Sequence, residues 1–221
     1  MYRFGLLLYV IALFSCTPSR LVKPLAKSQI GVAAHVGGPL IKYGNATIPM
    51  PLSSISAAYG WKDATSVFGS VHTTALLFGV GFIDLGVVHR VVAPQGYMPG
   101  VSITPMINVS TDFYKFKTKA WPQVDANVYW EYGKEKQHFV YAGVNNWFEL
   151  ATHIPNTEQK VSSHWFLTPQ LGNTWVPSKW RYSLELKWSA ANRESGYNVG
   201  GYSGMGGRGA VGVYVSVMRY F

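Results

Sequence analysis

His72-Thr73-Thr74 is the stretch of the sequence that comes nearest to a catalytic pair. A histidine two positions before a hydroxyl lies on the same strand face and could serve as its general base, and Asp84 follows on the next alternating run. Nucleophilic catalysis also needs the base within hydrogen-bonding distance of the hydroxyl, and here only the spacing points to it. We therefore expect no enzymatic activity and keep a hydrolase as a minor alternative.

The histidines are the other residues with possible site chemistry, and their spacing is not that of metal ligands. The six are His35, His72, His89, His138, His153 and His164. We expect them at scattered loop and rim positions, with no metal and no cofactor.

Charged residues occupy one face of the run 180–189. Arg181, Glu185 and Lys187 alternate with apolar residues that begin at Trp180 and end at Trp188, as in a strand with one polar and one apolar face. The charges that share this polar parity over three runs are Asp84, Asp125, Glu131, Arg181, Glu185 and Lys187. If these runs form the strands of a small barrel, the interior is narrow, and charges inside it must pair with one another or with trapped water. We expect a polar network that closes the lumen, with the lining of a narrow pore as the alternative.

Ten runs with period-two alternation must position these residues. They cover 29–37, 52–61, 65–74, 81–91, 100–113, 122–132, 137–148, 164–174, 180–190 and 209–221. The composition, with Gly 23, Tyr 14, Trp 8 and 13% charged residues, favours an all-β chain. We predict an antiparallel up-and-down transmembrane β-barrel of about ten strands, with eight strands as the alternative.

The linkers alternate in length, which is typical of a transmembrane barrel with long loops at one end and short turns at the other. The long linkers are 38–51, 113–121, 146–163 and 192–207, the short ones are 62–64, 94–100, 133–136 and 177–179, and the short linker 75–80 breaks the pattern. We expect Trp130, Trp180, Trp188 and Phe221 at the membrane interfaces. At about 3.3 Å per residue and a tilt of about 40°, Trp180 and Trp188 are separated by roughly 20 Å along the membrane normal.

Two features argue against regular strands. Pro105 and Pro169 fall within runs and predict bulges or irregular pairing. The uncharged stretch 64–83 is long enough for a transmembrane helix, although its Gly, Ser and Thr residues and His72 favour a strand, a loop and a strand.

The end of the chain resembles the last strand of Gram-negative outer-membrane β-barrel proteins. Val211, Val213, Val215 and Val217 share a face with the terminal aromatic Phe221. Arg219 lies on this apolar face too, where it is tolerated only near the interface. The resemblance implies an outer-membrane location with both chain ends in the periplasm.

The start of the chain predicts export. Residues 1–15 carry one positive charge and an apolar run too short to span a bilayer comfortably, as in a signal peptide. Leu13-Phe14-Ser15-Cys16 resembles a bacterial lipobox, which implies acylation of Cys16, for example with palmitate; ordinary cleavage nearby is the alternative. We predict a signal peptide at 1–15, a lipidated tether at 16–28 and the barrel at 29–221.

The net charge of +9 points to anionic partners. An exported barrel does not meet nucleic acid, so outer-membrane lipid and lipopolysaccharide are the candidates. Lys115, Lys117 and Lys119 continue the outward parity of the run 100–113, so a longer strand would present them as a ladder at the lipopolysaccharide phosphates. A solvated loop without a partner is the alternative.

Known barrel enzymes offer specific motifs for comparison. Omptin proteases use an Asp pair and an Asp-x-His pair, and neither spacing occurs in this sequence. Lipid A deacylases use His-x-Ser, to which His72-Thr73-Thr74 is similar but with Thr in place of Ser. We therefore expect a structural or accessory subunit that docks with other outer-membrane proteins, with a narrow pore for small solutes as the first alternative and a lipid-modifying enzyme as the second.

Overall fold

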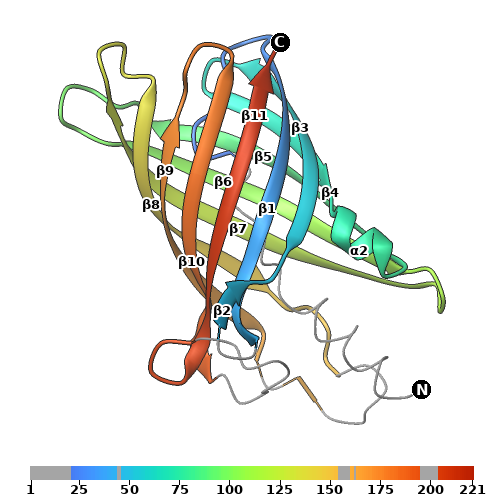
Figure 1. Cartoon of the computed structure of the whole chain (residues 1–221). Helices are drawn as coiled ribbons and strands as arrows, with labels where there is room; N and C mark the ends of the chain where they lie inside the picture. The colour runs from blue at the N-terminus through green and yellow to red at the C-terminus, as the bar shows by residue number, and fades with distance from the viewer. Residues whose placement is uncertain (1–20, 44–45, 154–159, 162, 195–203) are drawn as a thin grey trace.

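A computed structural model describes residues 21–43, 46–153, 160–161, 163–194 and 204–221. Eleven strands and one short helix lie in these residues (Figure 1). They are β1 (Ile30–Tyr43), β2 (Ala46–Pro49), β3 (Leu52–Lys62), β4 (Thr65–Val71), α2 (Thr73–Leu77), β5 (Val80–Val92), β6 (Gly100–Asp112), β7 (Lys117–Tyr132), β8 (His138–Phe148), β9 (Trp165–Trp175), β10 (Trp180–Glu194) and β11 (Arg208–Tyr220). Each of the ten predicted runs forms a strand. β1, β7 and β10 extend further than predicted, whereas β4 ends at Val71 and the predicted strand residues Thr73 and Thr74 lie in α2.

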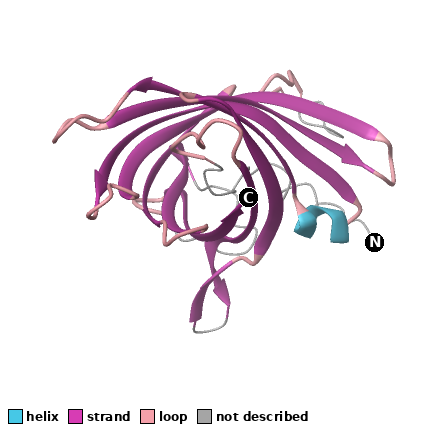
Figure 2. Cartoon of the chain, turned by 90° about the horizontal axis from the view of Figure 1, so that it is seen from above, coloured by secondary structure: helices cyan, strands magenta, loops and turns pink. Residues whose placement is uncertain are grey.

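Ten of these strands close into an antiparallel barrel. Each pairs with its neighbour in the chain, and β11 pairs with β1 from Gly31↔Tyr220 to Pro39↔Gly212. The short β2 pairs with the far end of β1, and the hairpin they form projects from the ring in the view from above (Figure 2). The predicted ten-stranded barrel is confirmed, and the eight-stranded alternative is wrong.

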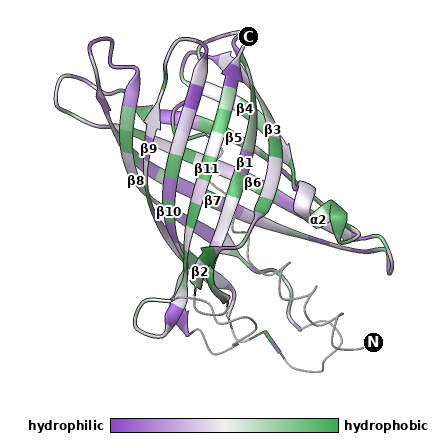
Figure 3. Ribbon diagram, viewed as in Figure 1, coloured by the Kyte–Doolittle hydropathy of each residue, from purple (hydrophilic) through white to green (hydrophobic). Residues whose placement is uncertain are grey.

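Hydrophobic and hydrophilic residues alternate along the strands of the barrel wall (Figure 3), and the two faces of the wall differ in polarity. On β10, Leu184 and Leu186 point outward with 43% and 47% of their surface exposed, whereas Glu185 between them is 1% exposed. On β7, Asp125 is 2% exposed and Trp130 is 43% exposed, so the predicted faces of both strands are correct. A barrel in water buries its apolar face instead, so this wall is suited to an apolar surrounding.

The ends of the barrel differ in their connections. The short-turn end carries the turns 63–64, 93–99, 133–137 and 176–179 together with Phe221. The opposite, long-loop end carries the β1–β2 hairpin, α2 and the connections that follow β6, β8 and β10. The turn 113–116 is tight, contrary to the predicted long linker, because β7 already begins at Lys117.

Both prolines lie at irregular pairing, which is one of the two predicted outcomes, and neither produces a bulge. At Pro105, β6 keeps one register with β7, while its recorded pairs with β5 stop at Met106 and resume at Ile103 without a shift. The pairs of β9 with β10 end at Gln170, next to Pro169. Each proline lacks an N–H for the ladder, so it interrupts or ends pairing on one side of its strand without a bulge.

The stretch 64–83 is not a transmembrane helix. It forms β4, the five-residue α2 and the start of β5. None of the helices in the described part of the chain is long and apolar enough to cross a membrane.

Candidate functional site

Residues 21–28 enter the barrel at the short-turn end and fill part of its interior. Leu21, Val22 and Leu25 are 2%, 1% and 4% exposed. Leu21 and Leu25 pack in a cluster with apolar residues from β1, β3, β4, β5, β6 and β11, and Val22 packs with aromatic residues of β7 and β8. Because these strands surround the lumen, the segment contacts walls on opposite sides; we call residues 21–28 the plug segment.

Side chains of the wall satisfy the backbone of the plug segment. The Ser102 hydroxyl donates to the Val22 carbonyl at 2.6 Å, and the Leu25 amide donates to the Ser66 hydroxyl at 2.8 Å. Both serines are fully buried, so these hydrogen bonds remove polar groups that would otherwise be costly. Where the segment leaves the lumen, a Cβ on Gly60 would overlap the Ala26 carbonyl oxygen, so only glycine leaves room for it.

The plug segment is also held by charge. The Lys23 Nζ lies 2.6 Å from Glu131 Oε1, and their side chains are 30% and 12% exposed. Burial of each of the three apolar side chains contributes roughly 1.5–3 kcal/mol, so packing holds the segment in the barrel. The ion pair fixes the position of Lys23 against Glu131 of β7. Residues 21–28 were predicted as part of a lipidated tether at 16–28 that precedes the barrel; instead Leu21, Val22 and Leu25 of this segment pack inside the barrel. The signal peptide 1–15, Cys16 and the rest of the predicted tether lie outside the described residues.

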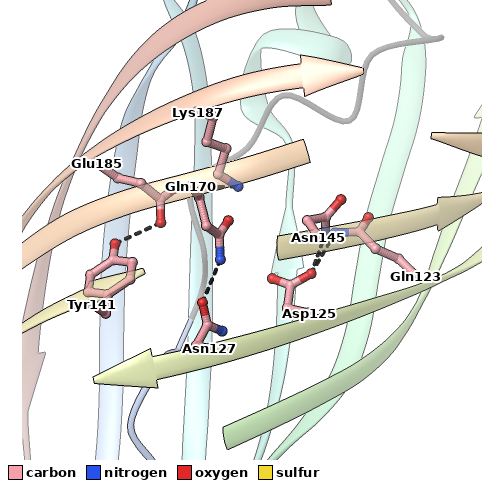
Figure 4. A network of polar contacts seen from close by, with 8 residues as sticks. All are labelled: Gln123, Asp125, Asn127, Tyr141, Asn145, Gln170, Glu185 and Lys187. Carbon is pink, nitrogen blue, oxygen red and sulfur yellow. Dashed lines mark hydrogen bonds and ion pairs between the residues drawn. The ribbon is translucent and has the colours of Figure 1, made fainter. Parts of the chain in front are cut away.

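A polar network lines the wall formed by β6 to β10 (Figure 4). Tyr141 donates to Glu185 at 2.7 Å, and Lys187 lies 3.3 Å from the other carboxylate oxygen. Asn145 and Gln123 donate to Asp125. Further contacts join Gln170 to Asn127 at 2.7 Å and Asn108 to Gln123 at 3.1 Å.

The six predicted interior charges therefore separate into several environments. Asp125, Glu185 and Lys187 belong to the β6–β10 network, and Glu131 binds the plug segment. Arg181 lies over the Phe139 ring, 5.1 Å from its centroid. Asp84 lies on β5, where its cross-strand partner is Asn108 of β6.

Asp84 contacts Ser70 and His72 on the neighbouring part of the chain. The Ser70 hydroxyl donates to Asp84 Oδ1, and His72 Nε2 lies 3.3 Å from the same oxygen. The His72 ring stacks on Phe82 with centroids 3.7 Å apart. The carboxylate thus lies between hydroxyl and imidazole, whereas a nucleophile needs the imidazole next to the hydroxyl. The hydroxyl of Thr74 lies 2.8 Å from that of Ser53 and accepts from the Ser53 amide, so these contacts do not build the pair suggested by the spacing.

Aromatic side chains line the interior near the long-loop end. Trp121 is 5.5 Å from Phe82 and 5.6 Å from Trp147, and Trp147 is 5.1 Å from Phe166, between ring centroids. Sequence reasoning missed this cluster, although a signal was present. Trp121 shares the parity of the interior residue Asp125, and Phe82 shares that of Asp84.

The predicted ladder of three lysines is corrected by the tight turn. Lys119 lies on β7, where its ammonium pairs with Glu149 and lies 5.8 Å from the Trp121 ring, so it belongs to the interior side. Lys115 in the turn and Lys117 at the start of β7 are exposed. The ladder is wrong for Lys119, because the turn 113–116 breaks the parity on which it depended.

Exposed aromatic residues surround the outside of the barrel near its short-turn end. They are Tyr59, Trp61, Trp130, Tyr132, Trp175, Trp180, Tyr182 and Phe221. Trp188, near the other end, is partly exposed and donates to the Arg208 carbonyl at 2.9 Å. The Arg219 guanidinium lies 5.5 Å from the Trp180 ring and 5.2 Å from the Phe221 ring, which places the charge among aromatic groups at the edge of the wall. Such aromatic girdles are typical of the two interfaces of a membrane barrel.

No metal site is evident in the described ranges, where no three His, Cys, Asp or Glu side chains are grouped closely enough to hold an ion.

The closed antiparallel sheet with an apolar exterior defines the protein as a transmembrane β-barrel. No protein-family model matches the chain, and no curated protein sequence matches it. Among solved structures it is similar to the translocator domain of autotransporter NalP from Neisseria meningitidis, at 10% identity over 100% of this chain and 95% of that one, with a TM-score of 0.41. It is also similar to the outer membrane protein OprG from Pseudomonas aeruginosa, at 12% identity over 91% of this chain and 99% of that one, with a TM-score of 0.35. The KdgM porin is similar at 7% identity over 87% of this chain and 99% of that one, with a TM-score of 0.41. Such similarities concern the fold alone, and the transmembrane class rests on the topology and on the polarity of the two faces.

Gly172 provides a test of the interior packing. Its cross-strand partner is Tyr141, and a Cβ on Gly172 would overlap Cζ and Oη of that ring, which donates to Glu185. We expect Gly172→Ala to lower the unfolding free energy by roughly 1–3 kcal/mol, the usual cost of overpacking. Urea unfolding of the barrel in lipid measures the loss.

Gly69→Ala is the matched control, because its Cβ would meet only the flexible end of Leu85 within 3 Å. If Gly172→Ala is as mild as Gly69→Ala, the packing of Tyr141 over Gly172 is refuted. In the Tyr141→Ala background, Gly172→Ala should have little further effect.

Proposed function

We propose that the chain is an outer-membrane barrel with its short-turn end in the periplasm, and that it acts as a structural or accessory subunit rather than as an open porin. The apolar wall and the aromatic girdle support the membrane location. The start of β1 beside the last residue, with Phe221 N bonded to the Ile30 carbonyl at 2.9 Å, supports a common side for both ends of the sheet.

The observation that carries the proposal is the plug segment. An open porin keeps a water-filled lumen, whereas here Leu21, Val22 and Leu25 occupy the interior and contact strands on both sides of it. A narrow pore would require the segment to leave, which exposes these three side chains and breaks the Lys23–Glu131 ion pair.

Lipopolysaccharide contact fits the exposed part of the turn between β6 and β7. Lys115 and Lys117 flank Phe116, which is 81% exposed, and Leu77 of nearby α2 is 85% exposed. Apolar side chains next to lysines match a lipid whose acyl chains lie beside its phosphates. We propose this turn, rather than a three-lysine ladder, as the lipopolysaccharide contact.

Acylation of Cys16 is proposed as part of the accessory role. A barrel is already held in the membrane by its wall, so an acyl anchor is redundant for attachment. We propose that the lipid aids targeting or docking to other outer-membrane proteins.

Conductance in planar bilayers tests the closed lumen. The wild-type protein should give no current steps. Leu25→Asp should give them, because an ionised carboxylate is not tolerated in the apolar cluster and displaces the segment.

Ala26→Asp is the control for this measurement, since it adds the same charge at the next, exposed position. Steady conductance of the wild-type protein would exclude a lumen closed by the plug segment and favour the pore.

Binding to lipopolysaccharide tests the turn. Loss of a basic residue near an anionic surface costs about 1 kcal/mol, so Lys115→Gln with Lys117→Gln should weaken binding by about thirtyfold at low salt. Surface plasmon resonance on captured lipopolysaccharide measures it.

The control pair is Lys134→Gln with Lys136→Gln, which removes two exposed lysines at the opposite end of β7. Equal losses for the two pairs would show charge attraction without a specific site.

Native electrophoresis of outer membranes in mild detergent tests the accessory role. We expect the wild-type protein to migrate in a complex larger than one barrel, and Cys16→Ser to reduce that complex. Migration as a single barrel in the wild type would refute the accessory role.

A further inference from the structure

A chamber of about 500 Å³ lies at the short-turn end, between the plug segment and the barrel wall. Its volume falls in the range of small-molecule sites, roughly 300–1,000 Å³. Leu25 and Pro24 of the plug segment form part of its lining, and Phe139, Val176 and Tyr220 line it from the wall. The chamber therefore offers apolar surface to an occupant.

The charged groups of the chamber are mostly cationic. Lys23, Arg90 and Arg181 line it together with a single acid, Asp63. Lys23 is neutralised by Glu131 at 2.6 Å. The two arginines against one aspartate then leave an excess of one positive charge.

Arg181 is the most constrained of these groups. It is 5% exposed, and its guanidinium lies 5.1 Å from the centroid of the Phe139 ring. Among the residues that the structure describes, no carboxylate oxygen lies within 4 Å of Arg181 or Arg90 in an ion pair. A guanidinium on an aromatic face keeps its edge N–H groups available for the two oxygens of a carboxylate.

We propose that this chamber binds a small amphipathic monoanion, whose carboxylate lies between Arg90 and Arg181. A single negative charge cancels the excess of the lining and relieves the desolvation of the buried Arg181. The apolar tail packs against Leu25, Phe139 and Val176. The plug segment forms part of the lining, so the site rests on the proposed closed lumen; conductance reports whether the plug segment is in place, and hexanoate binding reports on the site itself.

Isothermal titration calorimetry with hexanoate tests the site, on the full-length protein in phosphatidylcholine nanodiscs with empty nanodiscs as the blank. Hexanoate should give saturable binding that hexanol and inorganic phosphate do not match. Arg181→Gln should weaken hexanoate binding at least about tenfold, since charged hydrogen bonds are lost. Arg219→Gln, on the outer face beside Trp180, should leave it unchanged.

Absence of saturable hexanoate binding overturns the proposal. Hexanol binding of equal affinity also overturns it, because the arginines then contribute nothing to the affinity. Phosphate binding of equal affinity overturns it as well, because the apolar tail then contributes nothing. If Arg181→Gln does not fold, as judged by heat-modifiable migration on gels, Arg90→Gln decides: weaker binding supports the site, and unchanged binding refutes it.

Discussion

Closure of the sheet is the constraint on which the rest of the structure depends. In hydrocarbon no water can satisfy a backbone N–H or carbonyl group, so a strand cannot have a free edge there. The pairing of β11 with β1 removes both edges at once. It also places Ile30 and Phe221 side by side at the short-turn end, which is where the chain before β1 turns into the lumen.

Once the wall is closed with its apolar face outward, the interior receives the polar residues. They hydrogen-bond to one another along β6 to β10, as Tyr141 does with Glu185 and Gln170 with Asn127. The apolar residues Ala33, Ala58 and Phe68 on the other side of the lumen have no such partners, and Leu21 and Leu25 pack against them. The interior is thus a polar network on one side and an apolar seat for the plug segment on the other.

Strand positions and faces were predictable because both depend on local alternation. In β10, every second residue from Trp180 to Trp188 lies on the same face of the strand, so the alternation can be read directly from the sequence. The plug segment was not predictable in this way. Leu21-Val22-Lys23-Pro24-Leu25 has no periodicity, and its partners, such as Ser66 and Ser102, lie 41 and 80 residues away.

The error at Lys119 has a related cause. Parity carries from Phe113 to Lys119 only if the chain stays extended, but Phe116 adopts a left-handed φ of 50° in a tight turn that leads into β7. In the same way, the spacing of His72 and Thr74 suggested an imidazole next to a hydroxyl. It could not show that His72 lies against Asp84 and that Ser70 donates to the same carboxylate oxygen.

A spin-label accessibility scan along β10 tests the central claim most directly, that the apolar face of a closed wall meets lipid. In a Cys16→Ser background, single nitroxide labels at positions 180 to 188 would be measured in bilayers for collision with oxygen and with a water-soluble nickel complex. The account predicts oxygen accessibility that peaks at the even positions and falls at the odd ones. Peaks at the odd positions, or equal values throughout, would contradict it.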